Sequence, residues 1–453
     1  MTLKNPPPCF KGELEGVVAA TSPGPSLVRR GNGISGFGID MKIPRIHTGH
    51  VLGASSLLMI PFALFMSKAV AALFVATAIS GLTLFFIKER SWPDLPKSSL
   101  VFFAVVVIWG IISSIWSIAP ENSLHLSLPL AGTFLGGLVL ISLATRLRDD
   151  ERRFFEGALI IGACVGYAVL AIEIFTPLAL THAFWKITKG REVLIDYTQA
   201  NYYKSGMTVA ALMLWPAMGA LWKKGAGTGA ALLFASALFI NFQSGSGSST
   251  LAGIVAFSAF LISIAFQKRA AGIFLTLVIV SVFAMPLFSL LLPSAKDFEV
   301  KEYNLPESLY PRIFIWKFAA DYIQETPILG KGLNSSRALS SEKDKKTYPV
   351  LNHGSRTLEP IPLHPHSVVL QIWLEFGAVG AIMLVVLLRA LIRRLSKCDD
   401  LVLRAFGYGA FFSTLSITYV SYGIWSSWWQ GSLWLTAAFA TALVTEKNME
   451  NPG

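Results

Sequence analysis

The sequence predicts an all-helical membrane protein that crosses a lipid bilayer about twelve times. Only 14% of its 453 residues are charged and 53% are hydrophobic, with a mean hydropathy of +0.56. A soluble globular protein averages roughly 25% charged residues, so this chain has too little charge to cover a water-facing surface. Apolar runs of about 20 residues, the length that crosses a bilayer core, recur along the chain.

The first element is an N-terminal tail. Residues 1–45 are rich in Pro, Gly and Ser and show no periodicity, which is typical of disorder. No apolar run follows Lys4, which argues against a cleaved signal peptide. Because Met41 precedes Lys42 and Arg45 just ahead of the first apolar run, we expect translation to start at Met41. An intact mass that includes Met1 would contradict this expectation.

Twelve apolar segments follow the tail, and the basic residues between them set the orientation. Lys and Arg gather after the even-numbered segments, as in 146–153 and 389–404, and are almost absent from 117–124 and 421–427. The positive-inside rule therefore places both termini in the cytoplasm. The segments lie at approximately 51–67, 69–87, 99–116, 125–144, 154–175, 205–222, 228–243, 250–266, 271–292, 367–388, 402–420 and 429–445.

This pattern divides the chain into parts and explains its charge. The parts are the tail 1–45, segments one to nine in 46–292, an outer loop 293–366, segments ten to twelve in 367–445 and a cytoplasmic tail 446–453. The net charge of +11 is mostly the orientation signal, so it does not indicate nucleic-acid binding. Glycine pairs inside two of the segments, 132/136 and 162/166, are spaced for close helix packing.

Two long segments are predicted on the outer face, Thr176–Lys204 and Pro293–Pro365. They carry the only large hydrophilic surface that the sequence predicts. Loops longer than about 15 residues are uncommon and tend to be functional. We therefore expect any chemistry on the outer side of the membrane.

The second outer loop contains a predicted helix, Arg312–Glu325, between Pro311 and Pro327. At 100° per residue its charged residues share one side, but Arg312 falls in the apolar arc near Trp316. An arginine on a buried face needs an anion or a carboxylate, and its planar fork suits phosphate. A salt bridge or a snorkelling side chain would explain the position equally well.

Further polar candidates follow this helix. Lys331, in the turn GKGL, is a possible second phosphate contact. His364 and His366 lie at the mouth of the tenth segment, where a histidine is able to accept a proton near neutral pH. No cluster of Asp and Glu accompanies them, so we expect no metal. Glu375 lies about nine residues into the segment, where a carboxylate usually has a partner.

Three stretches resemble bacterial O-antigen ligases and the related polysaccharide polymerases. The most specific is His366-Ser367, nine residues, Gly377, two residues and Gly380. RIFIWKFAADYIQETPILGKGL (312–333) is similar to a second signature, and SSIWSIAPENSL (113–124) to a third. The chain departs from the family at QSGSGSST (243–250), where members often have Ser-Arg.

The resemblance implies a metal-independent, inverting glycosyltransferase of the GT-C type without a cofactor. Such enzymes move a glycan from undecaprenyl diphosphate to an acceptor outside the inner membrane. By this resemblance His366 is the general base and Arg312 the main diphosphate contact, with Arg191 as a further arginine. Lys331, His364 and Trp316 complete the substrate-binding set that we expect, provided that the loop folds back to bring Arg312 near His366.

The chemistry agrees with these residue types. A diphosphate is a good leaving group that needs cations rather than an acid, and an acceptor hydroxyl benefits from a base. The leading hypothesis is a ligase that uses a lipid A–core sugar as acceptor. A polysaccharide polymerase, a protein O-glycan transferase and, from another class, a lipid-linked glycan transporter remain as alternatives. A transporter is the least favoured because we find no internal repeat.

Overall fold

The computed structural model describes residues 46–190, 200–294, 297, 309–340, 346–350, 354–358 and 360–445. The predicted tails 1–45 and 446–453, with the expected start at Met41, lie outside these residues.

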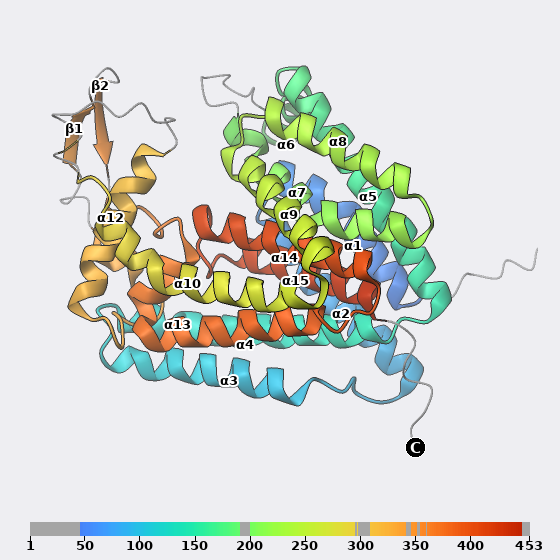
Figure 1. Cartoon of the computed structure of the whole chain (residues 1–453), viewed down its shortest axis with the longest axis horizontal. Helices are drawn as coiled ribbons and strands as arrows, with labels where there is room; N and C mark the ends of the chain where they lie inside the picture. Colours follow the sequence, from blue (N-terminus) through green and yellow to red (C-terminus); the bar gives the residue numbers. More distant parts are fainter. Residues whose placement is uncertain are drawn as a thin grey trace, which may run out of the picture. The chain divides into compact units, whose positions relative to one another are not determined.

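Each of the twelve predicted apolar segments coincides with a helix (Figure 1). The helices are α1 (Thr48–Phe65), α2 (Ala69–Glu89), α3 (Lys97–Ile112), α4 (Pro120–Thr145), α5 (Asp149–Phe175), α7 (Ala200–Lys223), α8 (Gly227–Gln243), α9 (Gly247–Phe266), α10 (Ala270–Leu290), α13 (Val368–Leu395), α14 (Leu401–Val420) and α15 (Ser427–Val444). Short 3-10 turns, η1 (Ser113–Ile115) and η2 (Gln267–Arg269), follow α3 and α9.

Nine stretches of the described chain are long and apolar enough to cross a membrane. One of them, Gly247–Leu290, contains both α9 and α10, whereas α8 is shorter and α15 is not among the nine. The polytopic helical architecture is therefore confirmed, and twelve crossings stay a prediction.

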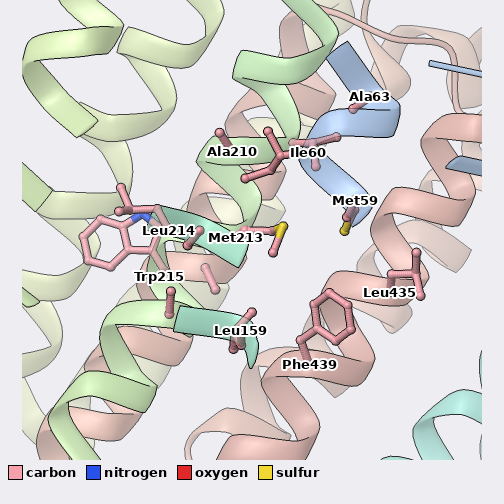
Figure 2. Close-up of a cluster of buried hydrophobic side chains, with 14 of the residues drawn as sticks. Met59, Ile60, Ala63, Leu159, Ala210, Met213, Leu214, Trp215, Leu435 and Phe439 are labelled. Carbon is pink, nitrogen blue, oxygen red and sulfur yellow. The ribbon is translucent and has the colours of Figure 1, made fainter. Parts of the chain in front are cut away.

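Helix α7 forms the centre of the bundle. Of its membrane-length window 83% is buried, against 11% for the stretch that contains α3. Figure 2 shows Met213 of α7 on the side of α1 and α15, which carry Ile60 and Phe439, whereas Trp215 points to the opposite side of α7. All four side chains are at most 1% exposed. Helix α7 is also the least hydropathic of the first six candidate spans. Because other helices cover it on all sides, contacts with those helices hold it in place.

Small residues bring α1 and α5 close together, as the glycine spacing predicts. A Cβ on Gly162 would lie 2.5 Å from the Ser56 carbonyl oxygen, and one on Gly166 would lie 2.3 Å from Ile60. The prediction for the other pair is wrong in part. Nothing lies within 4 Å of such a Cβ on Gly132, because that position of α4 faces away from the bundle.

The outer loops contain regular structure that the sequence analysis missed. Helix α6 (Ala179–Lys189) lies in the first loop. In the second, β1 (Lys346–Val350) and β2 (Gly354–Leu358) form an antiparallel hairpin, a departure from the all-helical prediction. Each strand has only five residues and β1 contains a proline, so the alternation is too short to be noticed.

Helix α12 (Tyr310–Glu325) confirms the predicted helix of the second loop. Proline in its first turn and Pro327 just beyond its end explain its limits. Ile315, Ala319 and Ile323 of the predicted apolar face are buried, and the helix packs against α10 and α13. The loop therefore folds back onto the tenth apolar segment.

Candidate active site

The site is built on a break in α13. Gly377, with φ of 60° and ψ of −150°, interrupts that helix, and the turn 327–332 that follows α12 fits into the gap. The break would leave helical carbonyl and N–H groups without hydrogen-bond partners, and the turn supplies those partners. Four backbone bonds do this: Lys331 N–H to Leu374 O (2.8 Å), Gly332 N–H to Glu375 O (2.9 Å), Ala378 N–H to Pro327 O (2.8 Å) and Val379 N–H to Ile328 O (3.4 Å).

The crossing requires glycine on both sides. A Cβ on Gly377 would lie 2.4 Å from the carbonyl of Ile328, and one on Gly330 would lie 2.4 Å from the carbonyl carbon of Glu375. Both glycines also have positive φ, a conformation that other residues adopt at a cost. The glycines of the turn and of the histidine–glycine motif are thus two halves of one contact.

The third stretch of resemblance meets the same turn. The Leu333 N–H donates to Ser113 Oγ at 3.0 Å, and Ser123 Oγ donates to the Leu333 carbonyl at 2.6 Å. The three stretches, far apart in sequence, therefore form one structural unit around the turn 327–333.

Glu375 is fully buried and joins this unit to the loop 421–426 between α14 and α15. Its carboxylate accepts four hydrogen bonds, from Asn334 N (2.6 Å), Ser336 Oγ (2.5 Å), Gln371 Nε2 (3.1 Å) and Trp425 Nε1 (2.5 Å). Gln371 also accepts from the N–H of Ile424 at 3.0 Å. The expectation that Glu375 has partners is confirmed, and they are hydrogen-bond donors.

Arg312 and His366 bind adjacent peptide carbonyls where α14 ends. Arg312 Nε donates to the Val420 carbonyl at 2.9 Å, and His366 Nδ1 pairs with the Ser421 carbonyl at 2.8 Å. Consecutive Cα atoms are about 3.8 Å apart, so the two side chains approach one small region. The structure thus brings together the two residues on which the expected chemistry depends.

The hydrogen bonds define the tautomer of each histidine. A carbonyl can only accept, so His366 carries its proton on Nδ1 and presents the lone pair of Nε2. The backbone N–H of His366 donates to His364 Nδ1 at 3.0 Å, which leaves the proton of His364 on Nε2. The rings lie 4.4 Å apart, and His366 has a positive φ of 53° that turns it back onto its neighbour.

Burial keeps both histidines neutral. It lowers the pKa of His364 to about 3, with the neighbouring His366 as a second cause. Burial also lowers the pKa of His366, the bond to Ser421 raises it, and the charge of Arg312 lowers it further. The pKa of Arg312 is lowered by burial as well, although a guanidinium stays charged. A neutral imidazole beside a cation can accept a proton while an anion is held nearby.

Lys204 on α7 is a residue of this region that the sequence analysis named only as the end of a loop. It interacts electrostatically with Arg312, His364 and His366. The only sequence signal was its place at the outer end of a predicted span.

Two of the other predicted binding residues, Lys331 and Trp316, lie elsewhere. Lys331 Nζ pairs with Glu325 at 2.6 Å, at the opposite end of α12 from Arg312 and about 20 Å along the helix axis. Trp316 packs in the apolar cluster between α12 and α13. Arg191 lies outside the described residues. Of the additional candidates that the structure describes, His364 alone joins Arg312 and His366.

Comparison with known proteins finds similarity over the part of the chain that contains these residues. A family model described as O-antigen ligase matches residues 230–385, which contain the broken helix, Arg312 and His366. A provisionally named polysaccharide ligase of Rickettsia felis is 27% identical over 350 residues, covering 75% of this chain and 78% of that protein. Similarly named proteins of Rickettsia conorii and Rickettsia typhi are also 27% identical, covering 77% and 74% of this chain and 80% and 76% of theirs.

The family model covers the contact of the turn with α13, and the relatives extend the similarity over most of the chain. Together they indicate an enzyme of the ligase or polymerase type that transfers glycans in a membrane. The chain is thus similar to the O-antigen ligase family over residues 230–385, and to provisionally named polysaccharide ligases over about three quarters of its length.

Proposed function

We propose that this protein is a lipopolysaccharide O-antigen ligase. It takes a glycan from undecaprenyl diphosphate and joins it to a sugar hydroxyl of lipid A–core, without a metal and with inversion at the anomeric carbon. The observation that carries the proposal is the meeting of Arg312 and His366 on the adjacent carbonyls of Val420 and Ser421.

In the proposed reaction His366 is the general base. Its Nε2 takes the proton of the acceptor hydroxyl while that oxygen attacks the anomeric carbon. The bond between the anomeric carbon and the diphosphate breaks, and the electron pair leaves with the phosphate oxygen. Attack from the face opposite the leaving group inverts the configuration. The bond from Nδ1 to Ser421 holds the ring and supports the imidazolium that forms.

Arg312 is the diphosphate contact in this proposal. Its charge lies beside the base in a half-buried setting, where attraction to a phosphate is stronger than in water. Its bond to Val420 fixes the guanidinium, so the site is ordered before the donor arrives.

The charge pattern supports an inner-membrane protein with a GT-C type fold and the reaction at the periplasmic side. The start of α12, the start of α13 and the loop 421–426 all lie at helix ends that the positive-inside rule places outside. Residues 293–366 then form a periplasmic catalytic loop, with both tails in the cytoplasm. Arg191, in the other outer loop, stays a predicted contact.

A purified-component assay tests the proposal. The protein in nanodiscs receives an undecaprenyl-diphosphate-linked glycan together with either lipid A–core or a second lipid-linked repeat. We expect a lipid A–core product and its loss in His366→Ala, since without a base the rate falls about 10²–10⁴-fold.

His125→Ala is the matched control, because His125 is an exposed histidine on α4. It should transfer at the wild-type rate. A product formed only with the second lipid-linked repeat would instead identify a polymerase. Full activity of a correctly inserted His366→Ala protein would refute the mechanism.

A further inference from the structure

Lys204 faces the same loop as the two central residues of the site. Thr208, one helical turn away and on the same face of α7, has its Oγ1 3.1 Å from the hydroxyl of Tyr422. Ser205 also bonds to that hydroxyl. Tyr422 directly follows Ser421, whose carbonyl holds His366. The first turns of α7 therefore bring Lys204 to the carbonyls that fix Arg312 and His366.

Lys204 is half-buried, yet among the described residues its electrostatic neighbours in the site are a cation and two neutral histidines. Several other lysines of the described chain have a carboxylate close by. Lys223, at the other end of α7, lies 2.9 Å from Glu156, and Lys331 lies 2.6 Å from Glu325. The half-buried ammonium of Lys204 and the nearby guanidinium of Arg312 repel each other, which costs free energy in the protein without ligand. An anion bound between the two cations would remove this cost.

We propose that Lys204 is a second phosphate-binding residue, which holds the donor diphosphate together with Arg312. The inference rests on the proposed function, because that function supplies a diphosphate. The two residues suit different tasks. The planar guanidinium, fixed by Val420, orients one phosphate, and the flexible ammonium follows the charge that develops as the glycosidic bond breaks.

The test compares Lys204→Gln, Lys204→Arg and the control Lys186→Gln, which alters an exposed lysine on α6. Two measurements are made in nanodiscs: kcat and KM for the lipid-linked donor, and the rise in melting temperature caused by inorganic pyrophosphate. Lys204→Gln should lower kcat/KM about tenfold or more, since a charged hydrogen bond is lost. It should also abolish the rise in melting temperature that pyrophosphate causes. Lys204→Arg and Lys186→Gln should retain both the wild-type kcat/KM and this rise in melting temperature.

The pyrophosphate measurement separates this proposal from the proposed function. If wild-type protein transfers no glycan from the lipid-linked donor but Lys204→Gln still loses pyrophosphate stabilisation, the proposed function fails and the phosphate site stands. If wild-type and Lys204→Gln proteins respond equally to pyrophosphate, or have equal kcat/KM, the role of Lys204 is refuted. A loss in Lys204→Arg as large as in Lys204→Gln also overturns it, because the charge is then irrelevant.

Discussion

Replacing Gly377 by alanine should dismantle the crossing between the turn 327–332 and α13. The new Cβ would lie 2.4 Å from the backbone of Ile328, and the positive φ adds strain of about 1–3 kcal/mol. Separating the segments removes four backbone hydrogen bonds, each contributing about 1 kcal/mol. The expected loss of stability is therefore about 5–7 kcal/mol.

This loss is measurable as a change in melting temperature. With an unfolding entropy of about 2.1 cal/mol/K per residue, it corresponds to roughly 6–8 °C for the folded part of the chain. The twelve tryptophans provide a fluorescence signal in detergent or nanodiscs. Transfer activity should fall with the melting temperature, because the crossing holds α12, and with it Arg312, against the helix that follows His366.

Gly272→Ala is the matched control. Gly272 lies in α10 with ordinary helical φ and nothing within 4 Å of an added Cβ, so alanine there should stabilise by up to about 1 kcal/mol. If Gly377→Ala melts within about 2 °C of the wild type and transfers glycan normally, the account of the broken helix is wrong.

Two further substitutions test the surroundings of the site. Glu375→Gln should cost about 1–3 kcal/mol, because its amide nitrogen would face a hydrogen-bond donor in either orientation. On one side it meets Nε2 of Gln371, and on the other the N–H of Asn334 and Nε1 of Trp425. An unchanged melting temperature would contradict this. Lys331→Gln should leave donor KM within about threefold of the wild type, since this lysine pairs with the exposed Glu325 at the far end of α12. A tenfold rise in KM would instead restore Lys331 as a phosphate contact.

The sequence predicted elements and faces better than it predicted partners. The helix of the second loop, the apolar position of Arg312 and the need of Glu375 for partners all follow from residue type and spacing. The partners of Arg312 and His366 are backbone carbonyls 108 and 55 positions away. Since every residue has a carbonyl, no pattern of side chains marks these two. Only the folded chain reveals that they are neighbours.

The lysines illustrate the same limit of prediction from sequence. Lys331 lies within the glycine-containing turn GKGL and was a possible phosphate contact, but the turn directs it back to Glu325, six residues earlier. Lys204 had no distinguishing motif, and the packing of α7 against Tyr422 brings it to the site. Spacing within one helix predicts which residues share a face, whereas the choice between two partly buried lysines depends on contacts between segments distant in the sequence.

The charges around His366 predict a base that strengthens when the donor binds. In the free protein burial lowers its pKa, and Arg312 on α12 and Lys204 on α7 lower it further, whereas His364 is neutral and the Ser421 carbonyl raises it. The neutral base should therefore persist below pH 6.5, and kcat/KM, which reports free enzyme, should fall only as the pH drops through this lowered pKa.

A diphosphate held by the two cations cancels their repulsion of the imidazolium, so the pKa of His366 rises in the complex. The acid limb of kcat at saturating donor should then lie at higher pH than that of kcat/KM. Both limbs should move to higher pH in Lys204→Gln, which lacks one of the repelling charges in the free protein and in the complex. Limbs that coincide in the wild type, or a kcat/KM limb above pH 6.5, would show that these cations do not act on the base.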